Sequence, residues 1–139
     1  MSRRRVLILC THNSARSQMA EGLLRAMADD RFEVASAGTE ATRVHPLALR
    51  VMDERGVDLR GHASKTLDRF LHEPWDYVIT VCDNAKENCP FFPSNAKKFH
   101  HNFSDPAKAV GTDEEVMAAF RSVRDSIKEF SNDFVNRHL

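Results

Sequence analysis

Cys10 and Arg16 have the residue types of a nucleophile and an anion-binding group, and five residues separate them. The segment between them is polar, follows an apolar run and precedes an amphipathic one. A loop of this size between a strand and a helix directs its backbone N–H groups at one point, where the positive end of the helix dipole also lies. These donors and a guanidinium favour a thiolate over a thiol. We therefore predict that Cys10 is a nucleophile at the base of an anion cradle and that Arg16 clamps the anion.

The predicted binding loop has a simpler interpretation, in which Cys10 is the last buried residue of a strand and Arg16 is a surface residue. The catalytic interpretation is favoured because the loop follows Cys10 directly and ends at Arg16, where the helix begins. The residues predicted to bind the anion are Thr11, His12, Asn13, Ser14, Ala15, Arg16 and Ser17.

Hydrophobic patterning predicts strands that alternate with helices, hence an α/β fold with a parallel sheet. The predicted strands cover residues 5–10, 32–38, 76–81 and about 98–101. Ser17 is expected to cap the first helix. The apolar face of that helix is predicted to hold Met19, Gly22, Leu23, Ala26 and Met27.

Three further helices are predicted. One begins at His45-Pro46 and stops at Gly56, and a short one is capped by Ser64. A long last helix begins with a capping box of Thr112 and Glu115. Its apolar stripe, which we expect to face the core, consists of Val116, Phe120, Val123, Ile127, Phe130 and Phe134.

Two more cysteines, Cys82 and Cys89, follow the third predicted strand. If the segment between them is helical, their alpha carbons lie roughly 10 Å apart, whereas a disulfide needs less than about 7 Å. The pair would then be a switch between a reduced helix and an oxidised loop. The alternatives are two thiols that never meet, or half of a metal site with His100 and His101, although the spacing matches no common zinc pattern.

Asp105 precedes Pro106, a pair that often only starts a turn. At the sheet edge where ligands bind in parallel α/β folds, this carboxylic acid could instead protonate a departing oxygen. Cys10, Cys82 and Asp105 all follow predicted strands and are expected at that edge. Asp53 and Glu54 are interpreted as plain surface charges.

The composition is that of an average soluble domain, with 139 residues, 29% charged and 42% hydrophobic residues, and a formal net charge of zero. We expect one domain over residues 1–139, a monomer, with no nucleic acid or membrane as partner. The basic residues 3–5 are interpreted as a solvated end. With no signal peptide and only three cysteines, a cytoplasmic protein with redox or nucleophilic chemistry is expected.

The loop from Cys10 to Arg16, the following Ser17 and the later Asp105-Pro106 resemble the low-molecular-weight protein tyrosine phosphatases. Together with Cys82 and Cys89, the sequence is similar to the thioredoxin-coupled arsenate reductases of that fold. The resemblance covers the whole chain. It implies a three-layer sandwich with a four-stranded parallel sheet, and no cofactor or metal.

The resemblance implies a relay of three cysteines that reduces arsenate, with phosphate or sulfate as analogues, in arsenic detoxification. Cys10 would attack arsenate while Asp105 assists the loss of an oxygen. Cys82 would then attack the Cys10 sulfur and release arsenite, and Cys89 would form a disulfide with Cys82. Thioredoxin, with a potential near −270 mV, would reduce it, although a glutaredoxin or mycothiol system could also serve.

The same resemblance gives roles to two loop residues: Ser17 would hydrogen-bond the Cys10 thiolate, and Asn13 would hold the loop in shape. His12 and Ala15 stand where relatives often have a glycine and another cysteine, so His12 must fit the loop backbone.

Some relatives bind potassium through oxygens near this loop. The oxygens of Asn13, Glu21 and Ser36 are present in this chain. The two other positions of that site, a Thr and an Asp in those relatives, are Ala63 and Lys65 here. We therefore expect the Lys65 ammonium in place of the ion. His62 is a weaker candidate for linking this region to the substrate.

Two other functions remain open from the sequence. One is phosphatase activity through a phosphorylated Cys10, although Ala107 and Lys108 stand where that class tends to place aromatic residues. The other is a thiol sensor of redox state or arsenite without turnover.

Overall fold

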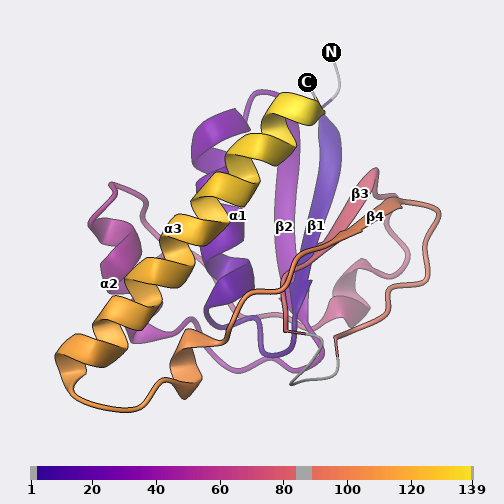
Figure 1. The fold of residues 1–139 in the computed structure, drawn as a ribbon. Helices are drawn as coiled ribbons and strands as arrows, with labels where there is room; N and C mark the ends of the chain where they lie inside the picture. The colour runs from indigo at the N-terminus through magenta and orange to yellow at the C-terminus, as the bar shows by residue number, and fades with distance from the viewer. Residues whose placement is uncertain (1–2, 84–88, 139) are drawn as a thin grey trace.

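The computed structural model describes residues 3–83 and 89–138. These residues contain a four-stranded parallel sheet in the order β2-β1-β3-β4, flanked by helices (Figure 1). The predicted α/β fold with its parallel sheet is confirmed. The strands are β1 (Arg4–Cys10), β2 (Phe32–Gly38), β3 (Tyr77–Thr80) and β4 (Lys97–His100). The helices are α1 (Arg16–Ala28), α2 (Pro46–Asp53) and α3 (Asp113–Arg137), with 3-10 helices η1 (Leu67–Phe70) and η2 (Pro106–Lys108).

Strand β1 is central, and both of its faces are buried. Val6, Ile8 and Cys10 join the apolar cluster shared with α1 and α3, whereas Leu7 and Leu9 join a second cluster on the other face. None of these five side chains is more than 2% exposed. This burial explains the unbroken apolar run, since a central parallel strand needs apolar residues on both faces.

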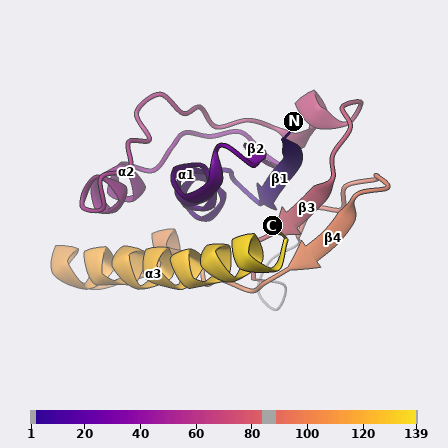
Figure 2. The ribbon, with the colours of Figure 1, turned by 90° about the horizontal axis from the view of Figure 1, so that it is seen from above.

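The molecule has three layers (Figure 2). Helices α1 and α3 pack side by side against one face of the sheet, and α2 lies beside them. The other face is covered by η1 and the loops around it, which contribute Phe70, Trp75 and Phe92 to the second apolar cluster. Among the described helices, none is long and apolar enough to cross a bilayer.

Helix α3 begins and packs as its sequence predicts. The Thr112 hydroxyl accepts the Glu115 N–H at 3.2 Å, and the Glu115 carboxylate accepts the Thr112 N–H at 3.2 Å. Phe120, Ile127 and Phe134 of the predicted stripe are buried. The capping box satisfies two backbone donors that the first turn of any helix leaves unpaired.

Two predicted helix caps are wrong. Helix α1 begins at Arg16 after Ala15 without a side-chain cap, and Ser17 lies inside the helix. Thr66, not Ser64, precedes η1, and the Ser64 hydroxyl donates to the backbone carbonyl of His12 at 3.1 Å. Both serines have tertiary partners around the loop after β1, and these partners outweigh the local capping preference.

Two smaller predictions also need correction. Ala26 of α1 is exposed, and its neighbours Leu24 and Ala28 are buried instead. Arg5 is more than part of a solvated end: its guanidinium pairs with Glu33 at 2.5 Å and lies 4.1 Å from the centre of the Trp75 ring. The ion pair and the ring contact tie β1 to β2 and to the segment before β3.

Glu54 is not a plain surface charge, because it joins the end of α2 to α3. Its carboxylate lies 2.8 Å from Arg121 and 2.7 Å from Arg124. The Arg124 side chain is only 3% exposed and also donates to the Val51 carbonyl at 2.8 Å. Hydrogen bonds from Arg121 and Arg124 lower the pKa of Glu54 from 4.5 to about 2.

We predict that Glu54→Gln lowers the urea midpoint of unfolding at neutral pH. A carboxyl whose folded pKa is lowered stabilises the fold above its unfolded pKa, and this stabilisation is lost as pH falls from 4.5 to about 2. The midpoints of wild type and variant should therefore converge over this range. Asp53→Asn, which removes the neighbouring charge, is the control; a difference that persists unchanged at low pH would contradict the prediction.

Candidate active site

A cavity of about 100 Å³ lies where β1 ends and α1 begins. It opens at the carboxyl edge of the sheet, where the strand order reverses between β1 and β3, the usual ligand position in such folds. The structure brings together here the predicted nucleophile, arginine and acid. The cavity is lined by Cys10, His12, Ser14, Ala15, Arg16, Thr42, Asp105 and Ala107.

The amide of Asn13 organises the loop from behind. Its oxygen accepts the Lys65 backbone N–H at 2.9 Å and the Gln18 side-chain N–H at 3.0 Å. Its nitrogen donates to the hydroxyls of Ser17 at 2.7 Å and Ser36 at 2.9 Å. These bonds use both acceptor sites and both donors of the buried amide, so its orientation is determined.

Asn13 is also the one described non-glycine residue with a positive φ, 49°. Asparagine enters this left-handed region more readily than most residues. The loop therefore does not require a left-handed backbone at His12, so a histidine fits where relatives often have a glycine. The His12 ring instead lies 3.3 Å from the Glu40 carboxylate.

The hydrogen bonds around Asn13 have a direction that leads to the thiol. Because the Ser17 oxygen accepts from Asn13, its own proton is available to the Cys10 sulfur, 2.8 Å away. On the other branch, the Ser36 hydroxyl accepts from Asn13 and donates to the Glu21 carboxylate at 2.5 Å. The Ser17 hydroxyl is therefore oriented to donate a hydrogen bond to the sulfur that the sequence predicts as the nucleophile.

Gly38, at the end of β2, lets the backbone approach the loop closely. A Cβ atom at this position would lie 2.7 Å from the Thr11 carbonyl oxygen and 2.8 Å from the Asn13 nitrogen. Just beyond it, the Glu40 N–H donates to that same Thr11 oxygen at 3.0 Å. A larger residue than glycine at position 38 would displace the cradle.

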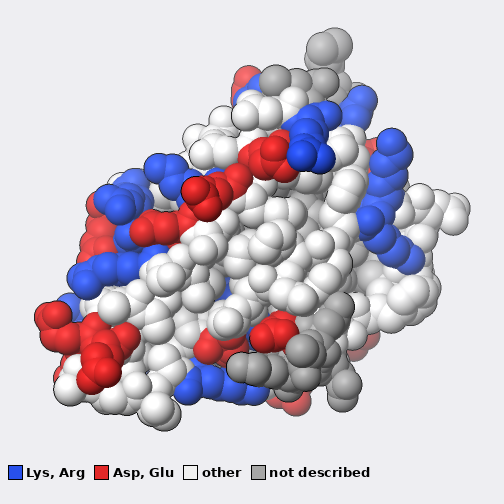
Figure 3. Space-filling view, viewed as in Figure 1, with Lys and Arg blue, Asp and Glu red and all other residues white. Residues whose placement is uncertain are grey.

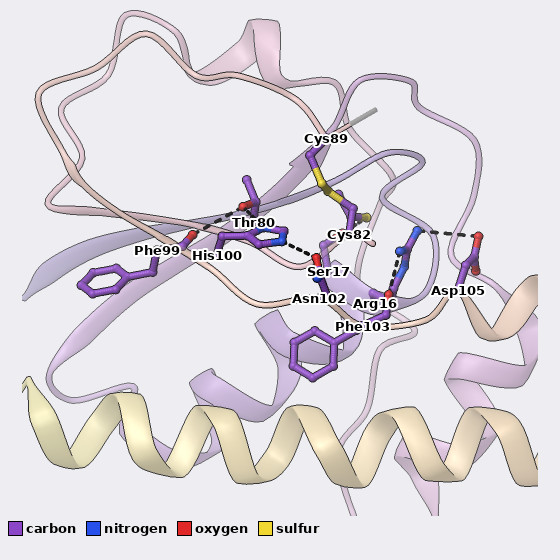
Figure 4. The surroundings of a disulfide bond; sticks show 11 residues. Arg16, Ser17, Thr80, Cys82, Cys89, Phe99, His100, Asn102, Phe103 and Asp105 are labelled. Atoms are coloured by element: carbon purple, nitrogen blue, oxygen red, sulfur yellow. Dashed lines mark hydrogen bonds and ion pairs between the residues drawn. A yellow bond between two sulfur atoms is a disulfide. The ribbon is translucent and has the colours of Figure 1, made fainter. Parts of the chain in front are cut away.

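Arg16 and Asp105 pair with each other and both line the cavity (Figure 4). The guanidinium, 3% exposed, donates to the Phe103 carbonyl at 3.1 Å and lies 3.6 Å from the Asp105 carboxylate. The other carboxylate oxygen of Asp105 accepts the Ala107 N–H at 3.0 Å and so caps η2. Asp105 thus starts a turn and also lines the cavity, whereas its role as an acid that protonates a departing oxygen stays a prediction.

His45 and Gln18 support the site but were not predicted to do so. The His45 backbone N–H donates to the Ser14 carbonyl at 3.0 Å. Burial, and then the charge of Arg43, lower the pKa of His45, while Asp105 opposes this shift. Gln18 is fully buried. The position of Gln18 directly after the predicted binding loop was the available signal, whereas His45 was recognised only as a helix start.

Lys65 and His62 lie on the far side of this network. The Lys65 ammonium donates to the Ala63 carbonyl at 2.7 Å, and burial lowers its pKa while Glu21 opposes this. The His62 ring lies 3.0 Å from the Gln18 amide oxygen and 3.6 Å from the Glu21 carboxylate. That the ammonium takes the place of a potassium ion stays a prediction.

Cys82 and Cys89 form a disulfide, with alpha carbons 5.9 Å apart (Figure 4). The interpretation as thiols that never meet is therefore wrong. The predicted helix between the two cysteines falls on residues 84–88, which lie outside the described part of the chain. Within the described part, no cluster of three or more His, Cys, Asp or Glu residues is arranged to hold a metal.

The sheet register brings Cys82 to the same edge of the sheet as Cys10. Leu9 pairs with Thr80, and the Val81 N–H donates to the Leu9 carbonyl at 2.9 Å. Cys10 ends β1, and Cys82 follows the neighbouring strand β3 by two residues, so both cysteines lie at the carboxyl edge of adjacent strands. Cys10 is a free, buried thiol, Cys82 has no exposed surface, and Cys89 is half-buried.

Comparison with known proteins gives this arrangement a family. The model of the low molecular weight phosphotyrosine protein phosphatase family matches residues 5–138. The chain belongs to this family. Within it, the chain is 47% identical to an arsenate reductase of Halalkalibacterium halodurans over 127 residues, which are 91% of each chain.

Solved structures of the family agree with this fold. A structure described as an arsenate reductase in the phosphate binding state matches with a TM-score of 0.78 and 30% identity over 96% of this chain and 98% of that one. A thioredoxin-dependent arsenate reductase of Corynebacterium glutamicum matches with a TM-score of 0.66 and 29% identity, over 94% of this chain and 61% of that one.

We predict that Ser17→Ala slows alkylation of Cys10 by iodoacetate about tenfold or more near neutral pH, since a hydrogen bond to a charged group is worth about 1.5–3 kcal/mol. The protein should be alkylated in the Cys82–Cys89 disulfide form, in which Cys10 is the free thiol. Ser14→Ala, in the same loop, is the control. Equal alkylation rates for wild type and Ser17→Ala would show that the hydroxyl does not favour the thiolate.

Proposed function

We propose that this protein reduces arsenate to arsenite through a relay of Cys10, Cys82 and Cys89, with thioredoxin as the electron donor. The observation that carries the proposal is the Cys82–Cys89 disulfide at the same sheet edge as a buried thiol in an anion cradle. The arsenate reductases among the relatives support the choice of oxyanion.

The first step is attack of the Cys10 thiolate on arsenate bound by the loop. Arg16 and the backbone N–H groups of residues 11–17 balance the charge of a tetrahedral oxyanion. A relative in a phosphate binding state supports a site for such ions. Asp105, opposite Arg16, donates a proton to the departing oxygen, which leaves as water while the sulfur bonds to arsenic.

The second step transfers two electrons to arsenic. The Cys82 thiolate attacks the Cys10 sulfur, the bond from sulfur to arsenic breaks, and its electron pair leaves with arsenite. The product is a Cys10–Cys82 disulfide, which the adjacent strand ends make feasible. Cys89 then attacks Cys82 and releases the Cys10 thiolate. The resulting Cys82–Cys89 disulfide is the form that the structure shows.

An external dithiol closes the cycle. Cys82 is completely buried and Cys89 only partly, so an incoming thiolate reaches the sulfur of Cys89. A reductant with the potential of thioredoxin, about −270 mV, is suited to this exchange. Thioredoxin acts in reducing compartments, so the proposal includes a cytoplasmic location.

The second candidate function is hydrolysis of phosphate esters through a phosphorylated Cys10. The family match and the placement of Arg16 and Asp105 favour this hydrolysis. The reaction needs neither Cys82 nor Cys89. One observation argues against phosphotyrosine as the substrate. The residue that lines the cavity after Pro106 is the small Ala107, where an aromatic residue would contact a tyrosine ring. A sensor without turnover remains the third possibility.

Arsenate turnover separates these functions, and it can be followed as NADPH consumption with thioredoxin and thioredoxin reductase. Wild type should turn over many times. We expect Cys89→Ser to release at most about one arsenite per molecule and then stop at the Cys10–Cys82 disulfide, and Cys82→Ser to release none.

Hydrolysis of p-nitrophenyl phosphate serves as the control for folding, since of the three cysteines it requires only Cys10. Both variants should retain whatever hydrolysis the wild type shows. Unchanged arsenate turnover in either variant would refute the relay of three cysteines. A wild type that hydrolyses the ester but consumes no NADPH with arsenate would establish the phosphatase function.

A separate prediction concerns the acid. Asp105→Asn should lower arsenate turnover about a hundredfold or more, the usual contribution of a general acid. Asp105→Glu should recover part of the loss. Because Asp105 acts before the disulfide forms, reduction of the Cys82–Cys89 disulfide by dithiothreitol should proceed at the wild-type rate. Turnover by Asp105→Asn within threefold of wild type would remove Asp105 from the mechanism.

A further inference from the structure

Two large apolar side chains are strongly exposed in the described part of the chain, Phe91 at 75% and Val110 at 88%. Phe91 comes two residues after Cys89, the half-buried sulfur of the disulfide. Val110 lies between η2 and α3, at the opposite side of the molecule from β4 (Figure 1). Single exposed apolar residues are common, so the position of Phe91 next to a reactive sulfur is what distinguishes it.

The exposure of Phe91 is enforced by its neighbour. Phe92 is 2% exposed and belongs to the apolar cluster on the η1 face of the sheet. Because Phe92 is anchored in this cluster, the adjacent Phe91 ring points to solvent. The Lys98 ammonium lies 4.5 Å from the centre of the Phe91 ring. The ring is thus an exposed feature of the oxidised form, with one cation over it.

The surface around this ring is basic. Lys97 and Lys98 are exposed on β4, the edge strand of the sheet. Lys and Arg side chains gather along the side of the molecule where β4 lies (Figure 3). A partner that covers the Phe91 ring therefore meets the Lys98 ammonium beside an apolar centre, an arrangement that suits an apolar surface bordered by carboxylates.

We propose that Phe91, with Lys98 beside it, is the docking contact for the protein dithiol that reduces the Cys82–Cys89 disulfide. This inference rests on the proposed function and names the contact by which its reductant binds. The occupant is a thioredoxin-like protein whose reactive thiol lies on an apolar surface. A surface that brings a thiolate to Cys89 comes close to the chain that follows this residue, and Phe91 is the exposed large apolar residue there.

Docking at Phe91 serves one exchange reaction. The partner thiolate bonds to the Cys89 sulfur, and the Cys82–Cys89 bond breaks, with Cys82 leaving as a thiolate. The second thiol of the partner then attacks the partner sulfur in the mixed disulfide and releases the Cys89 thiolate. Two electrons have passed to this chain, and the partner leaves as a disulfide.

The test compares two reductants on the same oxidised protein. Phe91→Ala should raise the KM for thioredoxin about tenfold, the usual loss for an aromatic contact at an interface, with little change in kcat. Reduction by dithiothreitol, which needs no docking surface, should be unchanged. Phe91→Leu should stay near the wild-type KM, and Val110→Ala, which removes an equally exposed apolar side chain elsewhere, should have no effect.

The outcomes separate this inference from the function on which it rests. If thioredoxin reduces the wild type and Phe91→Ala with the same KM, the docking contact is refuted and the relay stands. If dithiothreitol but not thioredoxin reduces the wild type, the thioredoxin coupling and the docking contact both fail. A slower reduction of Phe91→Ala by dithiothreitol would mean that the ring shapes the disulfide itself, which also overturns the docking role.

Discussion

The cradle depends on one buried side-chain amide. Asn13 receives two hydrogen bonds, from Gln18 and the Lys65 backbone, and gives two, to Ser17 and Ser36. A half-turn of the amide would set donors against donors and leave buried groups unpaired, at a cost of about 1–3 kcal/mol each. The orientation is therefore held, and with it the direction in which the Ser17 proton points. Loop shape and thiol chemistry follow from the same constraint.

The strand order adds the second requirement. In the order β2-β1-β3-β4, the chain moves to the other side of β1 after β2, so the ends of β1 and β3 are neighbours at the ligand edge. In the proposed function, Cys10 at one end attacks an oxyanion with the help of Arg16 and Asp105. The second cysteine, Cys82 after β3, then gives this attack a route to electron transfer. One fold can thus serve hydrolysis or reduction, depending on the side chains at two strand ends.

Local patterns predicted most of the fold, because hydrophobic periodicity and the capping box depend on neighbours in the chain. The α3 stripe and the buried run of β1 are examples. The predictions failed where a polar group had a distant partner. Ser17 and Ser64 look like helix caps but hold the cradle, and Glu54 looks like a surface charge but pairs with Arg124 of α3.

The sequence by itself determined the fold class and the identity of the reactive groups, since residue types and spacing identify the cradle and the cysteine pair. The tertiary structure alone decided how these groups face one another. It placed Asp105 against Arg16, aligned Cys10 with the end of β3, and left Phe91 exposed beside the disulfide. The physical reason is that pairing register, buried hydrogen-bond direction and exposure arise from contacts between distant segments, which no local pattern encodes.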